Sequence, residues 1–168
     1  GINAIEIKDG DALIEAKLTN GKNEIILAVR SGRAIRFNEQ DARPMGRTAA
    51  GVRGIRVTDG VKDAVVGMVC VDPEDTTTTI LVISEKGMGK RTSLEDYPTQ
   101  GRGGKGVKTM QLTDKTGKLV AIKSVTDEDD LMVTTVSGVI IRTAANEMRV
   151  MGRATQGVRV INLSEGDE

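Results

Sequence analysis

The chain has 168 residues, of which 38% are apolar and 29% charged, and its formal net charge is zero. This composition is typical of one soluble domain, and no apolar run approaches the roughly 20 residues that a membrane span requires. Histidine is absent and Cys70 is the one cysteine, which excludes zinc sites, Ser-His triads, Cys-His dyads and an intramolecular disulfide. Phe37 and Tyr97 are the only aromatic residues, too few for the stacking platforms that bind single-stranded nucleic acid. With no signal segment at the start, we expect a cytoplasmic protein, and any nucleic-acid partner should be a duplex.

One structural unit recurs along the chain, with its copies offset by 55 and then 51 residues. Each copy opens with two apolar strands around a glycine turn, at residues 24–37, 79–92 and 130–143. A third strand, beginning Gly-Val, follows at 51–57, 106–112 and 157–163, and a fourth at 63–71 and 118–125. Residues 1–7 and 12–18 resemble the third and fourth strands of an earlier copy. We therefore expect a half-repeat at 1–23 and repeats at 24–78, 79–129 and 130–168, with 13 strands in all.

The strands are rich in Val, Ile and Thr and are bounded by Gly, Asp and Asn, and no long segment has the 3.6-residue period of a helix. This predicts an all-β fold. Four strands per repeat of this length favour an array of four-stranded antiparallel blades, as in a propeller. Because the repeats at both ends are incomplete, we expect a piece of a longer domain that self-associates through exposed strand edges.

Basic residues recur in register between the second and third strands. A Gly-Arg pair occurs in each of these connections, at Gly46–Arg47, Gly101–Arg102 and Gly152–Arg153, and a basic position recurs on each hairpin. Residues 30–56, 86–108 and 138–159 hold 17 of the 24 basic residues and 5 of the 24 acidic ones. Such a track can contact successive phosphates without reading bases, although charged positions on β-repeats are also common as solvated faces. The predicted DNA contacts are Arg47, Arg102, Lys105, Arg153, Arg36, Lys90, Arg91 and Arg142.

The segment Gln100–Gly106, QGRGGKG, formally contains G-x-G-x-x-G. A dinucleotide site needs a helix after this motif, whereas the following residues VKTMQL predict a strand. A P-loop is excluded because Gly106 follows Lys105 where Ser or Thr is required. We predict a basic, glycine-rich loop whose backbone approaches phosphate while Arg102 and Lys105 supply charge; the alternative is a surface turn without a ligand.

Other candidates for chemistry point to structural roles. Asp41, Asp96 and Glu147 recur in register, but one carboxylate per repeat, each near a basic residue, favours a structural partner over a metal ligand, so no metal site is predicted. Tyr97 has no base or metal cluster nearby in sequence, and we expect it to be a packing residue. Cys70 is expected to be a core thiol.

Five segments, GVRGIRV, GKRTSLEDYPT, GRGGKGV, VSGVIIRT and MGRATQGVRVI, closely resemble the C-terminal domain of DNA gyrase A subunits, and the resemblance extends over nearly the whole chain. It implies a β-pinwheel, in which blades exchange strands and duplex DNA wraps around a basic rim. It further implies a non-catalytic part of an ATP-dependent type II topoisomerase that makes negative supercoils in the bacterial nucleoid. Its partners would be the remainder of the gyrase A protein and the gyrase B protein. The ATP and Mg sites and the DNA-cleaving tyrosine would lie elsewhere, leaving no cofactor here.

The family has a signature box of Gln, two basic residues, two Gly, a basic residue and Gly. Gln100, Arg102 and Gly103–Gly106 match it, whereas Gly101 replaces one basic residue. The resemblance therefore implies phosphate contact by Arg102 and Lys105 in a degenerate copy of the box. It does not imply the decisive role that the box has in the first blade.

Three alternatives stay open. The paralogous topoisomerase IV domain has more degenerate repeats, and the regularity of these copies favours gyrase. A protein-interaction propeller would present apolar or mixed patches in place of a basic rim. An enzyme built on a propeller lacks the His, Cys or clustered carboxylates it would need.

Overall fold

The computed structural model describes residues 1–58 and 62–166. Ten β-strands and three single-turn 3₁₀ helices lie in these residues, which confirms the predicted all-β class. In chain order they are β1 (Glu24–Val29), β2 (Arg33–Asn38), η1 (Glu39–Asp41), β3 (Val65–Val71), β4 (Thr79–Ser84), β5 (Met88–Ser93), η2 (Leu94–Asp96), β6 (Val107–Lys108), β7 (Leu119–Val125), β8 (Asp130–Thr134), β9 (Ile140–Ala144), η3 (Ala145–Glu147) and β10 (Val158–Arg159). None of the helices in this part of the chain has the length to cross a bilayer.

The three predicted hairpins form as antiparallel pairs, β1–β2, β4–β5 and β8–β9. β-Branched residues, which suit pleated strands, occur in all three hairpins; β1 and β4 are largely buried on both faces, whereas β8 and β9 are exposed on one face. In the first two hairpins a three-residue loop ends in a glycine with positive φ, 86° at Gly32 and 81° at Gly87. Such loops commonly close hairpins with a glycine in the left-handed region.

Each of the first two hairpins is the centre of a four-stranded sheet. The strand orders are β3-β1-β2-β6 and β7-β4-β5-β10, and β8 and β9 form a two-stranded sheet. β3 and β7 follow the hairpin of their own repeat, whereas β6 and β10 come from the repeat after it. Neighbouring blades therefore exchange a strand, as the family resemblance implied.

Three predicted strands are absent from the described part of the chain. Residues 1–7, 12–18 and 51–57 adopt no strand. The equivalents of 51–57, β6 and β10, each pair with the hairpin of the preceding repeat. Residues 1–23 form no such hairpin, so residues 51–57 have no edge to join. A strand needs a paired neighbour for its backbone groups, and sequence pattern alone does not provide one.

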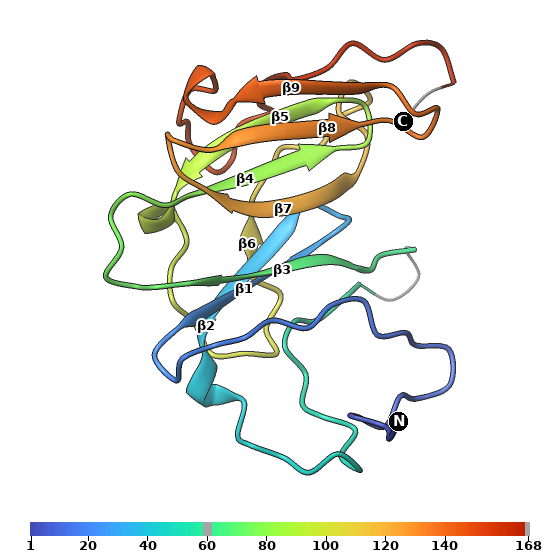
Figure 1. The fold of residues 1–168 in the computed structure, drawn as a ribbon, viewed down its shortest axis with the longest axis vertical. Helices are drawn as coiled ribbons and strands as arrows, with labels where there is room; N and C mark the ends of the chain where they lie inside the picture. The colour runs from blue at the N-terminus through green and yellow to red at the C-terminus, as the bar shows by residue number, and fades with distance from the viewer. Residues whose placement is uncertain (59–61, 167–168) are drawn as a thin grey trace.

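The sheets pack on one another with apolar cores between them. Ile26 and Val69 of the first sheet pack with Ile80 and Ile122 of the second, and Leu81 of the second packs with Leu131 of the third hairpin. Figure 1 shows the resulting stack, with β8 and β9 at one end, β4, β5 and β7 next to them, and β1, β2 and β3 beyond. The N-terminal segment lies at the other end from β8 and β9. This arrangement brings equivalent connections from successive repeats next to one another.

Candidate nucleic-acid interface

Three connections, each of which begins after a 3₁₀ helix and includes the Gly-Val segment of its repeat, carry basic residues and no acidic ones. Residues 42–58, 97–112 and 148–163 contain ten Arg and Lys residues and no Asp or Glu. We call these three segments together the basic ridge.

The ridge is continuous because each connection bonds to its neighbour. The Gly103 N–H donates to the Gly54 carbonyl at 2.6 Å, and the Arg56 N–H donates to the Gly104 carbonyl at 2.8 Å. One repeat further on, the Gln111 N–H donates to the Thr155 carbonyl at 2.9 Å. Backbone bonds of this kind fix the spacing between basic side chains on successive repeats.

Seven basic side chains of the ridge are exposed and, within the described residues, make neither a hydrogen bond nor an ion pair. They are Arg43, Arg47, Arg53, Arg56, Lys105, Arg149 and Arg159. Cations without an internal partner keep their full capacity to bind an external anion. Of the sequence predictions, Arg47 and Lys105 lie in this set. The other five were missed, although all lie in the same connections or in the Gly-Val segments that follow them.

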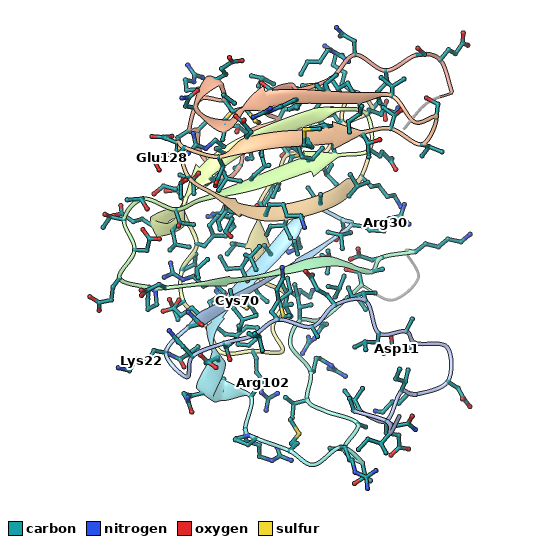
Figure 2. All side chains as sticks on the ribbon, in the orientation of Figure 1. Asp11, Lys22, Arg30, Cys70, Arg102 and Glu128 are labelled. Carbon is teal, nitrogen blue, oxygen red and sulfur yellow. The ribbon has the colours of Figure 1, made fainter. Side chains whose placement is uncertain are left out.

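Arg102 and Arg153, which were predicted to contact DNA, also have a structural role. The Nε of Arg102 donates to the Asp41 carbonyl at 2.8 Å and its Nη1 to the Arg53 carbonyl at 3.2 Å. Arg153 repeats the pattern one blade later, with the Asp96 carbonyl at 2.8 Å and the Lys108 carbonyl at 2.7 Å. Both side chains are half-buried. Each guanidinium thus ties its connection to the preceding one, and Figure 2 shows Arg102 against the segment that follows β2. Their contact with DNA stays a prediction.

The structure contradicts the prediction that Arg36 contacts DNA. Its side chain is only 10% exposed and forms an ion pair with Glu24. Its Nη1 also donates to the carbonyls of Leu94 at 2.9 Å and Tyr97 at 3.1 Å, in and just after η2 of the next repeat. Arg36 is buried between two blades and hydrogen-bonds from one to the other, which the sequence register does not reveal. We call a residue that links two blades in this way an inter-blade tie.

Arg91 is likewise an inter-blade tie and not a surface contact. Its side chain is 3% exposed and bonds Asp127 at 2.8 Å, Thr79 Oγ1 at 2.9 Å and the Ala145 carbonyl of η3 at 3.1 Å. The third residue in this register, Arg142, is 70% exposed and pairs, among the described residues, only with Asp130, so its contact with DNA stays a prediction. The difference arises because no described repeat covers β9.

The prediction of a direct DNA contact by Lys90 also does not fit the structure, because this side chain is fully buried. Its Nζ donates to the carbonyls of Gly152 at 2.9 Å, Thr155 at 3.0 Å and Arg153, and to Thr155 Oγ1 at 3.2 Å. Burial, reinforced by the positive charge of Arg153, lowers the pKa of this ammonium group to about 8. Lys90 therefore faces inward, beneath the connection that carries Arg153.

The box-like loop, residues Gln100, Gly101, Arg102, Gly103, Gly104, Lys105 and Gly106, arches over β2. It starts where the Gln100 N–H donates to the Arg36 carbonyl at 2.7 Å and ends where Val107 pairs with Ala34. No helix follows it: β6 follows, which confirms that this is not a dinucleotide fingerprint. Phosphate contact by this loop stays a prediction.

Tyr97 is buried, as predicted for a packing residue, and its hydroxyl hydrogen-bonds Thr109 Oγ1. Burial raises the pKa of this hydroxyl to about 12, so it is protonated at neutral pH. Cys70 is half-buried against the cluster around Ile25 and Phe37, and burial raises the pKa of its thiol. In residues 1–58 and 62–166 no three Asp, Glu or Cys side chains are grouped so that they could hold a metal ion.

Comparison with known proteins agrees with this geometry. The family model described as the DNA gyrase C-terminal domain, a β-propeller, matches residues 23–72, 78–126 and 129–168. The DNA gyrase A protein of Deinococcus deserti is 47% identical over 167 residues, covering 99% of this chain and 21% of that protein. Its counterpart from Staphylococcus epidermidis is 45% identical, covering 97% of the chain and 18% of its own length. The chain thus spans about a fifth of the curated relatives it matches.

Solved structures show the same fold. A structure of the DNA gyrase A C-terminal domain superposes with a TM-score of 0.88 at 26% identity, covering 99% of this chain and 55% of the other. The C-terminal domain of a DNA topoisomerase IV superposes with a TM-score of 0.86 at 24% identity, covering 95% of this chain and 48% of the other.

Proposed function

Because this chain belongs to the DNA gyrase C-terminal domain family, we propose that it binds duplex DNA along the basic ridge and wraps it without reading base sequence. The observation that carries this proposal is the set of seven exposed ridge cations that have no partner in the described part of the protein. Arg and Lys neutralise phosphates and release counterions, which supplies affinity but no sequence information.

The wrapping part of the proposal rests on the repetition of the ridge. Successive connections carry equivalent basic side chains and are locked to one another by backbone bonds such as that from Gly103 to Gly54. A binder that holds successive phosphates of one duplex along a curved array imposes that curvature on the DNA. A zero net charge does not oppose this, because the local field depends on where the charges lie.

For the whole protein we infer the role that the relatives' name carries. It would be one component of an ATP-dependent type II topoisomerase, in which the rest of the gyrase A protein works with gyrase B at the bacterial nucleoid. This part of the chain would wrap DNA, and strand cleavage, ATP and Mg would belong to other parts of the enzyme. The curated relatives are gyrase A proteins, which favours gyrase over topoisomerase IV.

Salt-dependent binding to a duplex of random sequence tests the DNA contact. We would compare the wild type with a ridge variant that has Arg47, Arg53, Lys105 and Arg149 changed to Ala. A matched control alters the net charge equally by changing four exposed lysines away from the ridge whose side chains make no hydrogen bond or ion pair with the described residues: Lys22, Lys62, Lys115 and Lys123.

We expect sequence-independent binding, with the slope of log K against log salt smaller by about 3 to 4 in the ridge variant, since each phosphate contact contributes about 0.9. The control variant should keep the wild-type slope. Equal slopes for the ridge and control variants would show that the ridge is not the contact surface.

A further inference from the structure

Residues 151–157 form a loop that arches over β5. At one foot the Met151 N–H donates to the Arg91 carbonyl at 2.8 Å, and at the other Val158 pairs with Gly89. Lys90 lies between these two anchor points and is fully buried. The loop therefore covers the buried side chain of Lys90, which is a cation.

The ammonium group of Lys90 organises the carbonyls of this loop. Three of them, from Gly152, Arg153 and Thr155, accept from Nζ, and Thr155 Oγ1 is a fourth acceptor at 3.2 Å. Charge-assisted bonds are stronger than neutral ones in a dry environment. The same group therefore fixes the orientation of three peptide planes at once.

The equivalent loop one repeat earlier, residues 100–106, encloses Ile35 instead. Ile35 is 1% exposed, and its Cδ1 lies 3.5 Å from the position that a Cβ on Gly104 would occupy. An apolar side chain can fill this place, so a lysine is not needed merely to occupy the volume. What Lys90 adds is the direction in which the carbonyls point.

In a trans peptide the N–H points away from the C=O of the same plane. Carbonyls directed inward at Lys90 thus place the N–H groups of Arg153, Ala154 and Gln156 on the opposite, outer side of the loop. Within the described residues none of these three N–H groups donates to an acceptor. Successive outward N–H groups beside a basic side chain form an anion-binding concavity.

We infer that Lys90 is a positioning residue for phosphate: it holds the loop so that the backbone N–H groups of Arg153, Ala154 and Gln156 bind one phosphate of the DNA backbone. This inference rests on the proposed function. It assigns the contact to main-chain groups, with a buried side chain that itself never touches DNA.

Two measurements on the whole chain test it. The first is duplex affinity and its salt slope for Lys90→Met, with Lys86→Met as a control that removes the same charge from an exposed lysine in the turn of the same hairpin. Neutral N–H groups release no counterion, so loss of this contact predicts an affinity about tenfold weaker for Lys90→Met with the salt slope of the wild type. A slope smaller by about one would mean that Lys90 itself neutralises a phosphate and would overturn the inference. Lys86→Met should keep both the affinity and the slope of the wild type.

The second measurement follows the backbone amide resonances of the wild type on addition of the duplex. We expect those of Arg153, Ala154 and Gln156 to shift, and in Lys90→Met, if that variant folds, to remain where they were. Wild-type protein that binds DNA without shifting these amides would overturn the inference and leave the proposed function standing. Wild-type protein that binds no duplex at all would instead refute the proposed function.

Discussion

Replacing Arg91 by Met should destabilise the fold strongly, whereas the same change at Arg142 should not. The two arginines occupy the same register, but the Arg91 side chain is 3% exposed and the Arg142 side chain 70%. Methionine keeps much of the aliphatic length and removes the charge. The comparison therefore isolates the inter-blade tie.

The magnitude follows from the bonds that are lost. Arg91→Met leaves the buried Ala145 carbonyl and the half-buried Thr79 hydroxyl without their donor, while Asp127, 77% exposed, regains water. Charge-assisted bonds are worth about 1.5 to 3 kcal/mol net, so we expect a loss of about 3 kcal/mol in the free energy of unfolding. The surface pair of Arg142 with Asp130 is worth less than about 1 kcal/mol.

Urea unfolding followed by circular dichroism measures both values. Salt-dependent DNA binding by the folded variants adds a second criterion, because a buried side chain makes no phosphate contact and Arg91→Met should keep the wild-type slope. Equal losses of stability at the two positions would refute the assignment of Arg91 as a tie between blades. A slope smaller by about one in Arg91→Met would restore it as a DNA contact.

Three further predictions concern a tight turn, a buried hydroxyl and a buried ammonium group. Gly106→Ala should lower the free energy of unfolding by at least about 2 kcal/mol, because φ is +72° and the added Cβ would meet a β2 carbonyl. The control Gly101→Ala, which has no atom within 4 Å of the added Cβ, should change it by less than about 0.5 kcal/mol in the same urea assay. Tyr97→Phe should cost about 1 to 2 kcal/mol in thermal unfolding, because the buried Thr109 hydroxyl loses its partner; an unchanged midpoint would contradict this. The pKa of Lys90 is about 8 in the folded protein, below its ordinary 10.5. Between pH 8 and 10.5 the unfolded chain therefore binds more protons than the folded one. In this range the stability of the wild type should rise with pH relative to that of Lys90→Met. Parallel pH profiles of the two proteins would count against this depressed pKa.

The hairpins and the fourth strands were predictable because their apolar, β-branched residues have a strong local signal and recur at fixed offsets. β3 and β7, for example, lie within the predicted segments 63–71 and 118–125. The third strands were harder. β6 is only two residues long, and whether such a segment pairs depends on a hairpin in another repeat.

The ridge was predicted in outline but not residue by residue. Lys90 and Arg91 lie on β5, which is buried on both faces because the sheets pack against one face and the next connection covers the other. Strand alternation alone cannot distinguish such a position from a solvated one. The in-register pattern of Arg36, Arg91 and Arg142 was real, but at Arg36 and Arg91 its cause is contact between repeats. Contact of the exposed Arg142 with DNA stays a prediction.

The most direct test of DNA wrapping along the ridge is the linking number of a closed circular plasmid. A nicked plasmid would be sealed by ligase in the presence of increasing amounts of the chain, and its topoisomers separated after the protein is removed. We predict a shift of the linking-number distribution in one direction that grows with the amount of wild-type chain and is lost in the variant with Arg47, Arg53, Lys105 and Arg149 changed to Ala. DNA that is bound at saturation but sealed with an unshifted distribution would contradict wrapping.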